Sequence, residues 1–266
     1  MRKSRHCQSF ANWRRGNRQI DHVAICQRIE KIALELGGKS PLLVFDDCDF
    51  ELAVQTALDA NFYTAGEVCS NATRVFVQRS IADKSVAAMI DKTERMVVGD
   101  PMAADVNMGA LISASHLDKV LDYVKIGRAE GAQIATGGKQ IHPQGFENGY
   151  FMEPTILTNC TDSMRVTREE IFGPVMSVLI FDGEQDAIER ANSTEFGLGA
   201  GVMTTDLSHA HRMADRLMSG NVWVNSFNIL LPSLPFGGAT HSDLGRENSI
   251  NTLDAYSEVK SVHITL

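Results

Sequence analysis

The chain has 266 residues and a mass of 29.2 kDa, with 44% hydrophobic and 22% charged residues. This composition is typical of a globular protein and excludes a disordered chain, a collagen-like repeat and a small disulfide scaffold. The formal net charge of −8 argues against a general nucleic-acid surface. No apolar run approaches the ~20 residues that a membrane helix needs, so we expect no membrane partner.

The N-terminal charge differs from that of the rest of the chain. Residues 1–31 carry eight Lys/Arg and two acidic residues, a net charge of +6. A mitochondrial targeting segment is one interpretation of this composition. The stretch lacks a Ser-rich amphipathic pattern, however, and we favour an atypical basic lead-in over residues 1–33.

Cysteine usage points to a reducing compartment. The five cysteines form no CxxC pair and are odd in number. A disulfide framework or a zinc ribbon is therefore disfavoured. We expect a cytoplasmic protein without a metal site.

Apolar runs alternate with helical patterns from Leu34 onward. Strand patterns that alternate with helical patterns predict βαβ units, and hence an α/β fold with a largely parallel twisted sheet flanked by helices. Ser80 and Asp83 resemble a capping box at the start of one helix, and Asp49 is a candidate N-cap of another. The expected strands cover residues 41–45, 73–78, 133–135, 150–157, 174–181, 198–204 and 221–225, and the expected helices cover 49–62, 80–96, 116–131, 186–192 and 206–219.

The C-terminal tail alternates apolar and polar residues over 256–266, as a strand does. It follows a long polar stretch, so it need not pair within the main sheet. We expect a domain over residues 34–252 and a separate strand segment over 253–266. An isolated strand edge invites pairing with another chain, which predicts a homo-oligomer.

Two local motifs stand out from the rest of the chain. The first is Leu34-Glu35-Leu36-Gly37-Gly38-Lys39-Ser40-Pro41, in which a carboxylate precedes two glycines that allow close backbone approach. The second is Phe62-Tyr63-Thr64-Ala65-Gly66-Glu67-Val68-Cys69-Ser70-Asn71, which places a cysteine after a glycine turn. Alone, the first is a common turn and a lone cysteine is more often a small buried hydrophobe.

Taken together, the motifs resemble the two active-site signatures of the aldehyde dehydrogenase superfamily, with Glu35 and Cys69 separated by 34 residues. Further matching blocks follow in order, and the resemblance covers about residues 33–266. Among superfamily members, the chain is most similar to the betaine-aldehyde and amino-aldehyde dehydrogenases. The further blocks are Glu169-Glu170-Ile171-Phe172-Gly173-Pro174, Asn192-Ser193-Thr194-Glu195-Phe196-Gly197-Leu198-Gly199, Pro235-Phe236-Gly237-Gly238, Gly245-Arg246-Glu247-Asn248 and Tyr256-Ser257-Glu258-Val259-Lys260-Ser261-Val262.

The resemblance implies NAD(P)-dependent oxidation of an aldehyde to a carboxylic acid. Cys69 would attack the aldehyde carbon, and its backbone N–H would help to hold the oxyanion. Loss of hydride to the nicotinamide would leave a thioester on the cysteine. Glu35 would then act as the general base that directs water at this thioester, a role typically worth ~10²–10⁴ in rate.

The resemblance also assigns the binding residues. Glu170 would accept hydrogen bonds from the nicotinamide ribose, with Phe172 and Leu36 as further cofactor contacts. NAD is the expected cofactor and NADP is possible within the family. A small-molecule aldehyde would enter a channel walled by Phe62, Tyr63, Phe227 and Phe236, although each aromatic side chain could simply belong to the core.

Other polar residues have simpler interpretations. Of the adjacent pair, only Glu170 matches the family, so Glu169 is expected to lie elsewhere. His209 and His211 are two apart on a helix, do not share a face, and are expected to be solvated.

Several family features are missing from this sequence. The Pro-Trp-Asn segment with its oxyanion asparagine, the Lys-Pro-Ser/Ala-Glu segment and the Gly-Ser-x-x-x-Gly turn do not occur, and Asp243 stands where the family commonly has glycine. The chain thus resembles the catalytic portion without most of the cofactor domain. The alternative function is a non-dehydrogenase remnant or an interaction subunit, with residual esterase activity.

Overall fold

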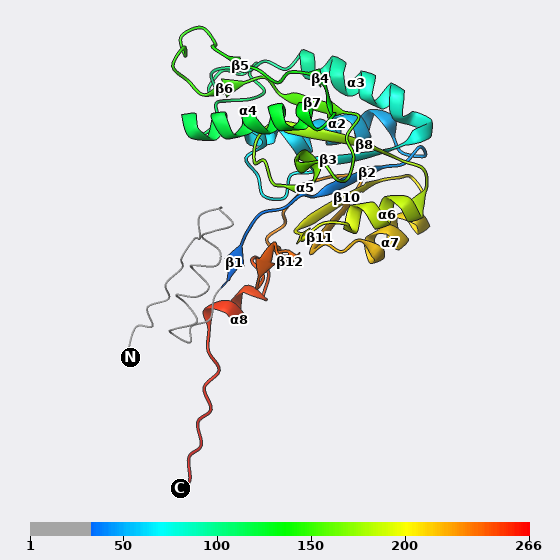
Figure 1. Ribbon diagram of the computed structural model, residues 1–266. Coiled ribbons are helices and arrows are strands. Elements are labelled where there is room, and N and C mark those ends of the chain that lie inside the picture. Colours follow the sequence, from blue (N-terminus) through cyan, green and yellow to red (C-terminus); the bar gives the residue numbers. More distant parts are fainter. Residues whose placement is uncertain (1–32) are drawn as a thin grey trace.

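A seven-stranded sheet forms the centre of the computed structural model, which describes residues 33–266 (Figure 1). The spatial order is β11-β10-β2-β3-β8-β7-β4, and all neighbours are parallel except β4 with β7. The expected α/β class with a largely parallel sheet is therefore confirmed. The strands are β2 (Pro41–Val44), β3 (Arg74–Gln78), β4 (Gln133–Thr136), β7 (Thr155–Thr158), β8 (Val175–Phe181), β10 (Gly199–Met203) and β11 (Asn221–Val224).

Helices cover both faces of this sheet. Figure 1 shows α2, α3 and α4 on one side and α6 and α7 on the other. Successive strand residues point to opposite faces, so Leu42 and Val44 join one hydrophobic core and Leu43 joins the other. The helices are α2 (Phe50–Phe62), α3 (Ala82–Glu94), α4 (Ala114–Ala129), α5 (Arg165–Arg168), α6 (Glu184–Asn192) and α7 (Leu207–Arg216), with the 3₁₀ turns η1 (Tyr63–Gly66) and η2 (Arg79–Ile81).

Two predicted helix starts have different outcomes. Asp49 caps α2, because its side chain accepts a hydrogen bond from the Leu52 backbone N–H at 3.1 Å. The capping box at Ser80 and Asp83 is wrong. The Ser80 hydroxyl donates to Asp46 at 2.7 Å, and α3 begins at Ala82 without a side-chain cap.

Within residues 33–266, three short antiparallel pairs lie outside the central sheet. One of these pairs brings the segment that contains Glu35 beside a segment about 200 residues later in the chain. Figure 1 shows β1 and β12 next to each other below the sheet. The pairs are β1 (Leu34–Glu35) with β13 (Asp243–Leu244), β9 (Phe196–Gly197) with β12 (Ala239–Thr240), and β5 (Gln140–Ile141) with β6 (Phe151–Met152).

The two ends of the chain were predicted to be a basic lead-in and a separate strand. Residues 1–32 of the predicted lead-in lie outside the described residues. At the other end, α8 (Thr252–Tyr256) occupies the start of the predicted strand segment, and residues 257–266 form no helix or strand within this chain. Figure 1 shows this tail extending away from the body. Its pairing with another chain stays a prediction.

None of the described helices combines the length and apolar character required to cross a membrane.

Candidate active site

The turn that carries Cys69 is packed directly against the segment that carries Phe172. Gly66 has a φ of +73°, and a Cβ placed there would lie 2.3 Å from the carbonyl carbon and oxygen of Gly173. Only glycine tolerates both the left-handed backbone and this contact. The glycine thus allows the end of α2 and the loop between α5 and β8 to pack closely together.

The two glycines after Leu36 bring a third segment to the same place. A Cβ on Gly37 would lie 2.2 Å and 2.3 Å from the carboxylate oxygens of Glu170, and a Cβ on Gly38 would lie 2.7 Å from the Cys69 carbonyl oxygen. The Gly38 backbone N–H donates to Glu170 Oε1 at 3.1 Å. The expected close approach at this glycine pair is confirmed, and its partners are Glu170 and the Cys69 backbone.

Glu35 lies opposite Asp243 in the β1–β13 pair, and their side chains are hydrogen-bonded. Burial, followed by the negative charges of Asp243 and Glu247, raises the pKa of Glu35 to about 8. Burial also raises the pKa of Asp243, to about 6, against the opposing effect of backbone N–H donors at Leu36 and Gly238. Both carboxyl groups therefore keep a proton to a higher pH than a free carboxyl does, and they titrate as a pair.

The thiol of Cys69 lies within the field of these acidic groups. Burial is the largest cause that raises its pKa to about 11, and the charges of Asp243, Glu35 and Glu170 add to it. A hydrogen bond from the Ser70 backbone opposes the shift. The thiolate, which is the reactive form, is a minor species at neutral pH in this state.

Phe172 is held in a left-handed conformation, with a φ of +60°. Its carbonyl oxygen lies 2.5 Å from His116 Nε2, which is also 3.3 Å from Glu67 Oε1. The Phe172 carbonyl is the hydrogen-bond partner of this nitrogen, and the nearby Glu67 carboxylate places the Cys69 turn beside α4. Sequence reasoning missed His116 because its partners are distant in the chain and its own helix shows only an apolar periodicity.

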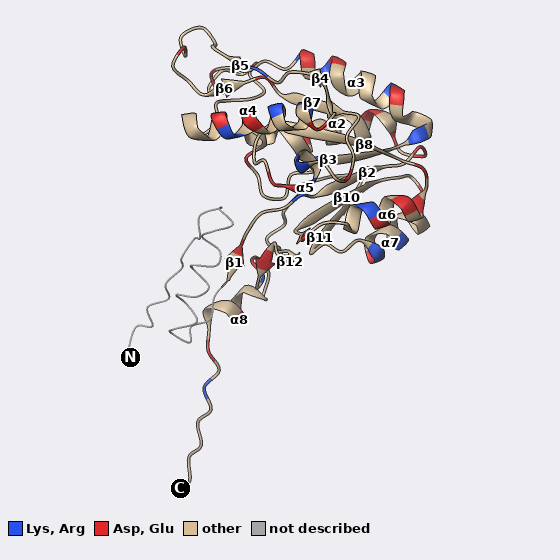
Figure 2. Cartoon of the chain, in the orientation of Figure 1, with Lys and Arg blue, Asp and Glu red and all other residues tan. Residues whose placement is uncertain are grey.

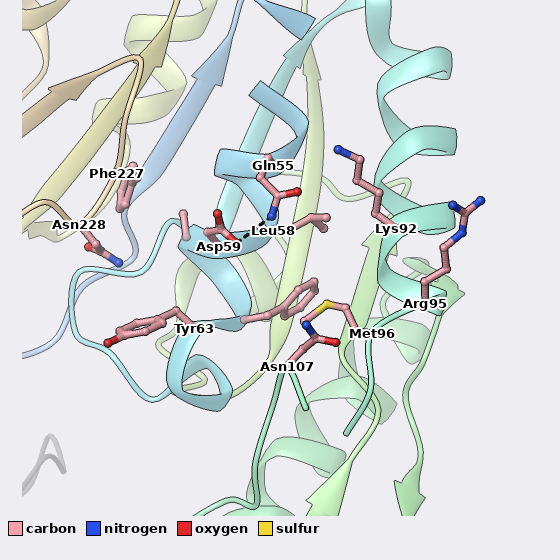
Figure 3. A pocket seen from close by; sticks show the side chains of 12 residues that line it. Gln55, Leu58, Asp59, Tyr63, Lys92, Arg95, Met96, Asn107, Phe227 and Asn228 are labelled. Carbon is pink, nitrogen blue, oxygen red and sulfur yellow. Dashed lines mark hydrogen bonds between the residues drawn. The ribbon is translucent and has the colours of Figure 1, made fainter. Parts of the chain in front are cut away.

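A pocket of about 660 Å³ opens beside α2 and α3 (Figure 3). It brings together Phe62, Tyr63 and Phe227, three of the four predicted channel residues. The fourth, Phe236, is not among its lining residues, and its backbone pairs with Glu247 instead. The polar side chains that border the pocket are Gln55, Asp59, Lys92, Arg95, Asn107 and Asn228.

Asn228 connects this pocket to the segment after Cys69. Its Oδ1 accepts a hydrogen bond from the Ser70 hydroxyl at 2.7 Å, and its Nδ2 donates to Asn71 Oδ1 at 2.9 Å. The pocket wall and the Cys69 turn are thus joined by side-chain hydrogen bonds.

The remaining polar predictions have mixed outcomes. Glu169 lies elsewhere, as expected, because it binds Arg165 at 3.0 Å and the Tyr123 hydroxyl at 2.8 Å. The prediction of a solvated His209 is wrong, since its side chain is 13% exposed and its ring packs on Phe45 at 4.3 Å. Among residues 33–266, no group of three or more His, Cys, Asp or Glu side chains is arranged to hold a metal ion.

The model of the aldehyde dehydrogenase family matches residues 13–262 of the sequence. The chain belongs to the aldehyde dehydrogenase family. It is similar to betaine aldehyde dehydrogenases of Mesorhizobium japonicum, with 49% identity over 89% of this chain, and of Brucella melitensis, with 48% identity over 90%. It spans about half the length of these relatives, 49% in each case.

Solved structures of the family share the fold. A betaine aldehyde dehydrogenase from Staphylococcus aureus, crystallised in complex with NAD+, matches 90% of this chain with a TM-score of 0.87 and 42% sequence identity. This chain covers 48% of that protein. An apo mutant of the same enzyme matches with a TM-score of 0.89 and 42% identity over 91% of this chain.

Asp243, which stands where the family commonly has glycine, has a structural consequence beyond its own turn. The sequence suggested only an altered turn at this position. The structure places the carboxylate opposite Glu35 instead, because the register of the β1–β13 pair makes the two residues Cα partners. No local signal in the sequence reveals a pairing across 208 residues.

Proposed function

We propose that this aldehyde dehydrogenase family member uses Cys69 and Glu35 to oxidise an aldehyde to a carboxylic acid with NAD(P)+. The supporting observation is the convergence of three distant segments, in which Gly38 meets Cys69 and Gly66 meets Gly173. The charge of Glu35 acts directly on the Cys69 thiol, so the two groups share one electrostatic environment.

Cys69 supplies the nucleophile in this proposal. Its thiolate attacks the aldehyde carbon and forms a thiohemiacetal, whose oxyanion is stabilised by the Cys69 backbone N–H. Departure of hydride then leaves a thioester on Sγ. Because the pKa of the thiol is raised to about 11, the attacking thiolate forms only after a proton is lost.

Glu35 supplies the base for the second half. Its carboxylate takes a proton from the water that attacks the thioester carbon, and the acid product leaves with regeneration of the thiol. Since its pKa is raised to about 8, Glu35 must first release its own proton to solvent.

The cofactor, when bound, accepts the hydride. Glu170 fits the ribose hydroxyls, because a carboxylate accepts several hydrogen bonds and the missing Cβ of Gly37 leaves room for it. Phe172 and Leu36 supply apolar contacts beside it. NAD+ is the cofactor with which the Staphylococcus aureus enzyme was crystallised, and NADP+ is the alternative within the family.

The substrate class in this proposal is a betaine or amino aldehyde. The pocket combines the rings of Tyr63 and Phe227 with the carboxylate of Asp59 (Figure 3). Aromatic faces and a carboxylate together attract an ammonium group. The similarity to betaine aldehyde dehydrogenases supports the same class.

An interaction subunit with residual esterase activity is the second candidate. It is favoured by a run of exposed apolar side chains, Ile229, Leu230, Leu231 and Leu234, each at least 50% exposed. Contiguous exposed apolar surface is typical of protein interaction sites. The tail over residues 253–266 would add a homo-oligomer contact.

Two assays on the purified chain test these candidates. Aldehyde-dependent NADH formation with betaine aldehyde reports the whole reaction, and hydrolysis of p-nitrophenyl acetate reports acyl transfer at the cysteine alone. C69A should abolish ester hydrolysis, whereas C48A should leave it unchanged. E35Q should give a burst followed by a slow steady state, because deacylation needs the base.

The outcomes separate the candidates. Ester hydrolysis that depends on Cys69, without NADH formation, favours the second candidate. Ester hydrolysis that persists at the wild-type rate in C69A contradicts both candidate functions, because each assigns Cys69 as the nucleophile.

A further inference from the structure

Two carboxyl groups lie side by side at the β1–β13 pair. Glu35 and Asp243 are directly opposite Cα partners in an antiparallel pair, and their side chains are hydrogen-bonded. Opposite residues in such a pair have Cβ atoms about 4.5–5.5 Å apart. Two carboxylates at this separation repel, so one of them keeps a proton.

Backbone hydrogen bonds determine which of the two carboxyl groups keeps the proton. Asp243 Oδ1 accepts a hydrogen bond from the Leu36 N–H at 2.9 Å, and Oδ2 accepts one from the Gly238 N–H. Two N–H donors stabilise an anion. The hydrogen bond with Asp243 favours the protonated form of Glu35 and the ionised form of Asp243. Glu35 is therefore the donor of the pair.

The other charges near the pair do not reverse the preference for a proton on Glu35. Glu247 adds negative charge near Glu35, and Arg246 opposes it with positive charge. Arg246 Nη1, however, donates to the carbonyl oxygens of Gly238 and Gly245, at 2.7 Å in each case. Figure 2 shows acidic residues on β1 and in the neighbouring segment around β12. Glu170 and Cys69 are further titratable groups at this place.

We propose that Asp243 is a positioning residue that keeps the shared proton on Glu35 and turns the Glu35 carboxyl toward β13. Glu35 then becomes a base only at a pH high enough to remove this proton. The inference rests on the proposed function, in which Glu35 is the base, and it adds a residue that the family pattern does not supply.

The test uses Cys69 as a reporter and needs no cofactor. The rate of Cys69 alkylation by iodoacetamide is measured from pH 6 to pH 10 by peptide mass spectrometry on the full chain. Only the thiolate reacts, so the logarithm of the rate should rise by about one per pH unit below the pKa of the thiol. Ionisation of Glu35 raises the pKa of Cys69 further, which lowers this slope in the window where Glu35 titrates.

We expect the wild-type slope to fall below one near pH 8. D243N should move the pH range of the reduced slope downward by about one pH unit, because a negative charge beside Glu35 is removed. E35Q should keep a slope near one throughout. The matched control is D215N, which changes an exposed aspartate on α7 and should leave the wild-type window in place.

A second measurement tests the inference on wild-type protein, in case D243N does not fold. In wild-type protein labelled with ¹³C at glutamate carboxyls, the signal that E35Q removes should titrate in two steps, since Glu35 senses Asp243. A single step near the ordinary value of 4.5 overturns the inference, as does an unmoved window in folded D243N. A constant slope of one in the wild type refutes the role of Asp243 but leaves Cys69 as the nucleophile. Absence of Cys69 labelling at every pH instead contradicts the proposed function.

Discussion

Lys39 follows the two glycines of the Glu35 motif and is buried, with 1% of its surface exposed. Among the described residues, its Nζ has no hydrogen-bond partner. Burial, followed by the nearby charge of Arg74, lowers its pKa from 10.5 to about 7, although Glu170 acts in the opposite direction. A buried ammonium without a hydrogen bond opposes folding.

The pH dependence of stability follows from this shift. Between pH 7 and pH 10.5 the unfolded chain binds a proton that the folded chain lacks, so the free energy of unfolding should rise with pH across this window. K39M should remove that contribution and increase the free energy of unfolding at pH 7 by about 1–3 kcal/mol. Urea unfolding at several pH values measures both effects. K92M, which removes a partly exposed ammonium, should leave this pH dependence unchanged. A pH dependence in K39M as steep as that of the wild type, or steeper, would refute this account.

Two constraints act on Gly66: its φ is left-handed, at +73°, and a Cβ added there would lie 2.3 Å from the Gly173 backbone. G66A should separate the Cys69 turn from the Phe172 segment and lower the free energy of unfolding by about 2–4 kcal/mol. Thermal unfolding measures the loss. G183A is the matched control, because a Cβ there meets nothing within 4 Å and should cost little. Equal melting temperatures for the two variants would contradict the proposed packing.

At the scale of the elements, the starts of α2 and α3 show where local hydrogen bonds form and where a tertiary contact replaces them. Asp49 caps α2 through a bond within its own turn, which local spacing predicts. Ser80 has the same local chemistry, but Asp46 from the end of β2 accepts its hydroxyl and a 3₁₀ turn intervenes before α3. A partner from the tertiary structure competes successfully with the local backbone.

This difference predicts different costs of substitution. D49A should lower the free energy of unfolding by about 1 kcal/mol, because an N-terminal backbone donor of α2 loses its partner. D83A should change it by less than about 0.5 kcal/mol, since Asp83 caps nothing in α3. Guanidinium unfolding measures the free energy of unfolding of both variants. Equal losses would contradict the absence of a capping box at Ser80 and Asp83.

At the scale of the whole molecule, the C-terminal tail extends away from the body (Figure 1). Val259, Val262, Ile264 and Leu266 are each at least 68% exposed, and residues 257–266 form no strand within this chain. Apolar side chains at this exposure gain free energy when another surface covers them. The alternating pattern favours pairing with a strand edge of a second copy.

Light scattering tests this self-association. A chain that ends at Ser257 keeps α8 intact and should show a lower mass than the full chain at equal concentration. A full-length variant with serine in place of Val259, Val262 and Ile264 keeps the chain length and should behave like the shortened one. Equal masses for all three proteins would show that the tail does not mediate assembly.

The sequence alone determined the elements that depend on local periodicity. The order of strands and helices, the Asp49 cap and the glycine pair at Gly37 and Gly38 follow from residues near one another in the chain. Hydrophobic period, cap chemistry and chain flexibility act over a few residues, so one sequence is enough to predict them. The family motifs likewise identified Cys69 and Glu35 as candidates.

Only the tertiary structure decided which distant groups share an environment. The pairing of Glu35 with Asp243, the contact of His116 with Phe172 and the separation of Phe236 from the pocket depend on strand register and loop packing. The protonation of Glu35 and Cys69 depends on burial and on charges contributed by other segments. These effects act through space between residues up to about 200 positions apart, and no local pattern encodes them.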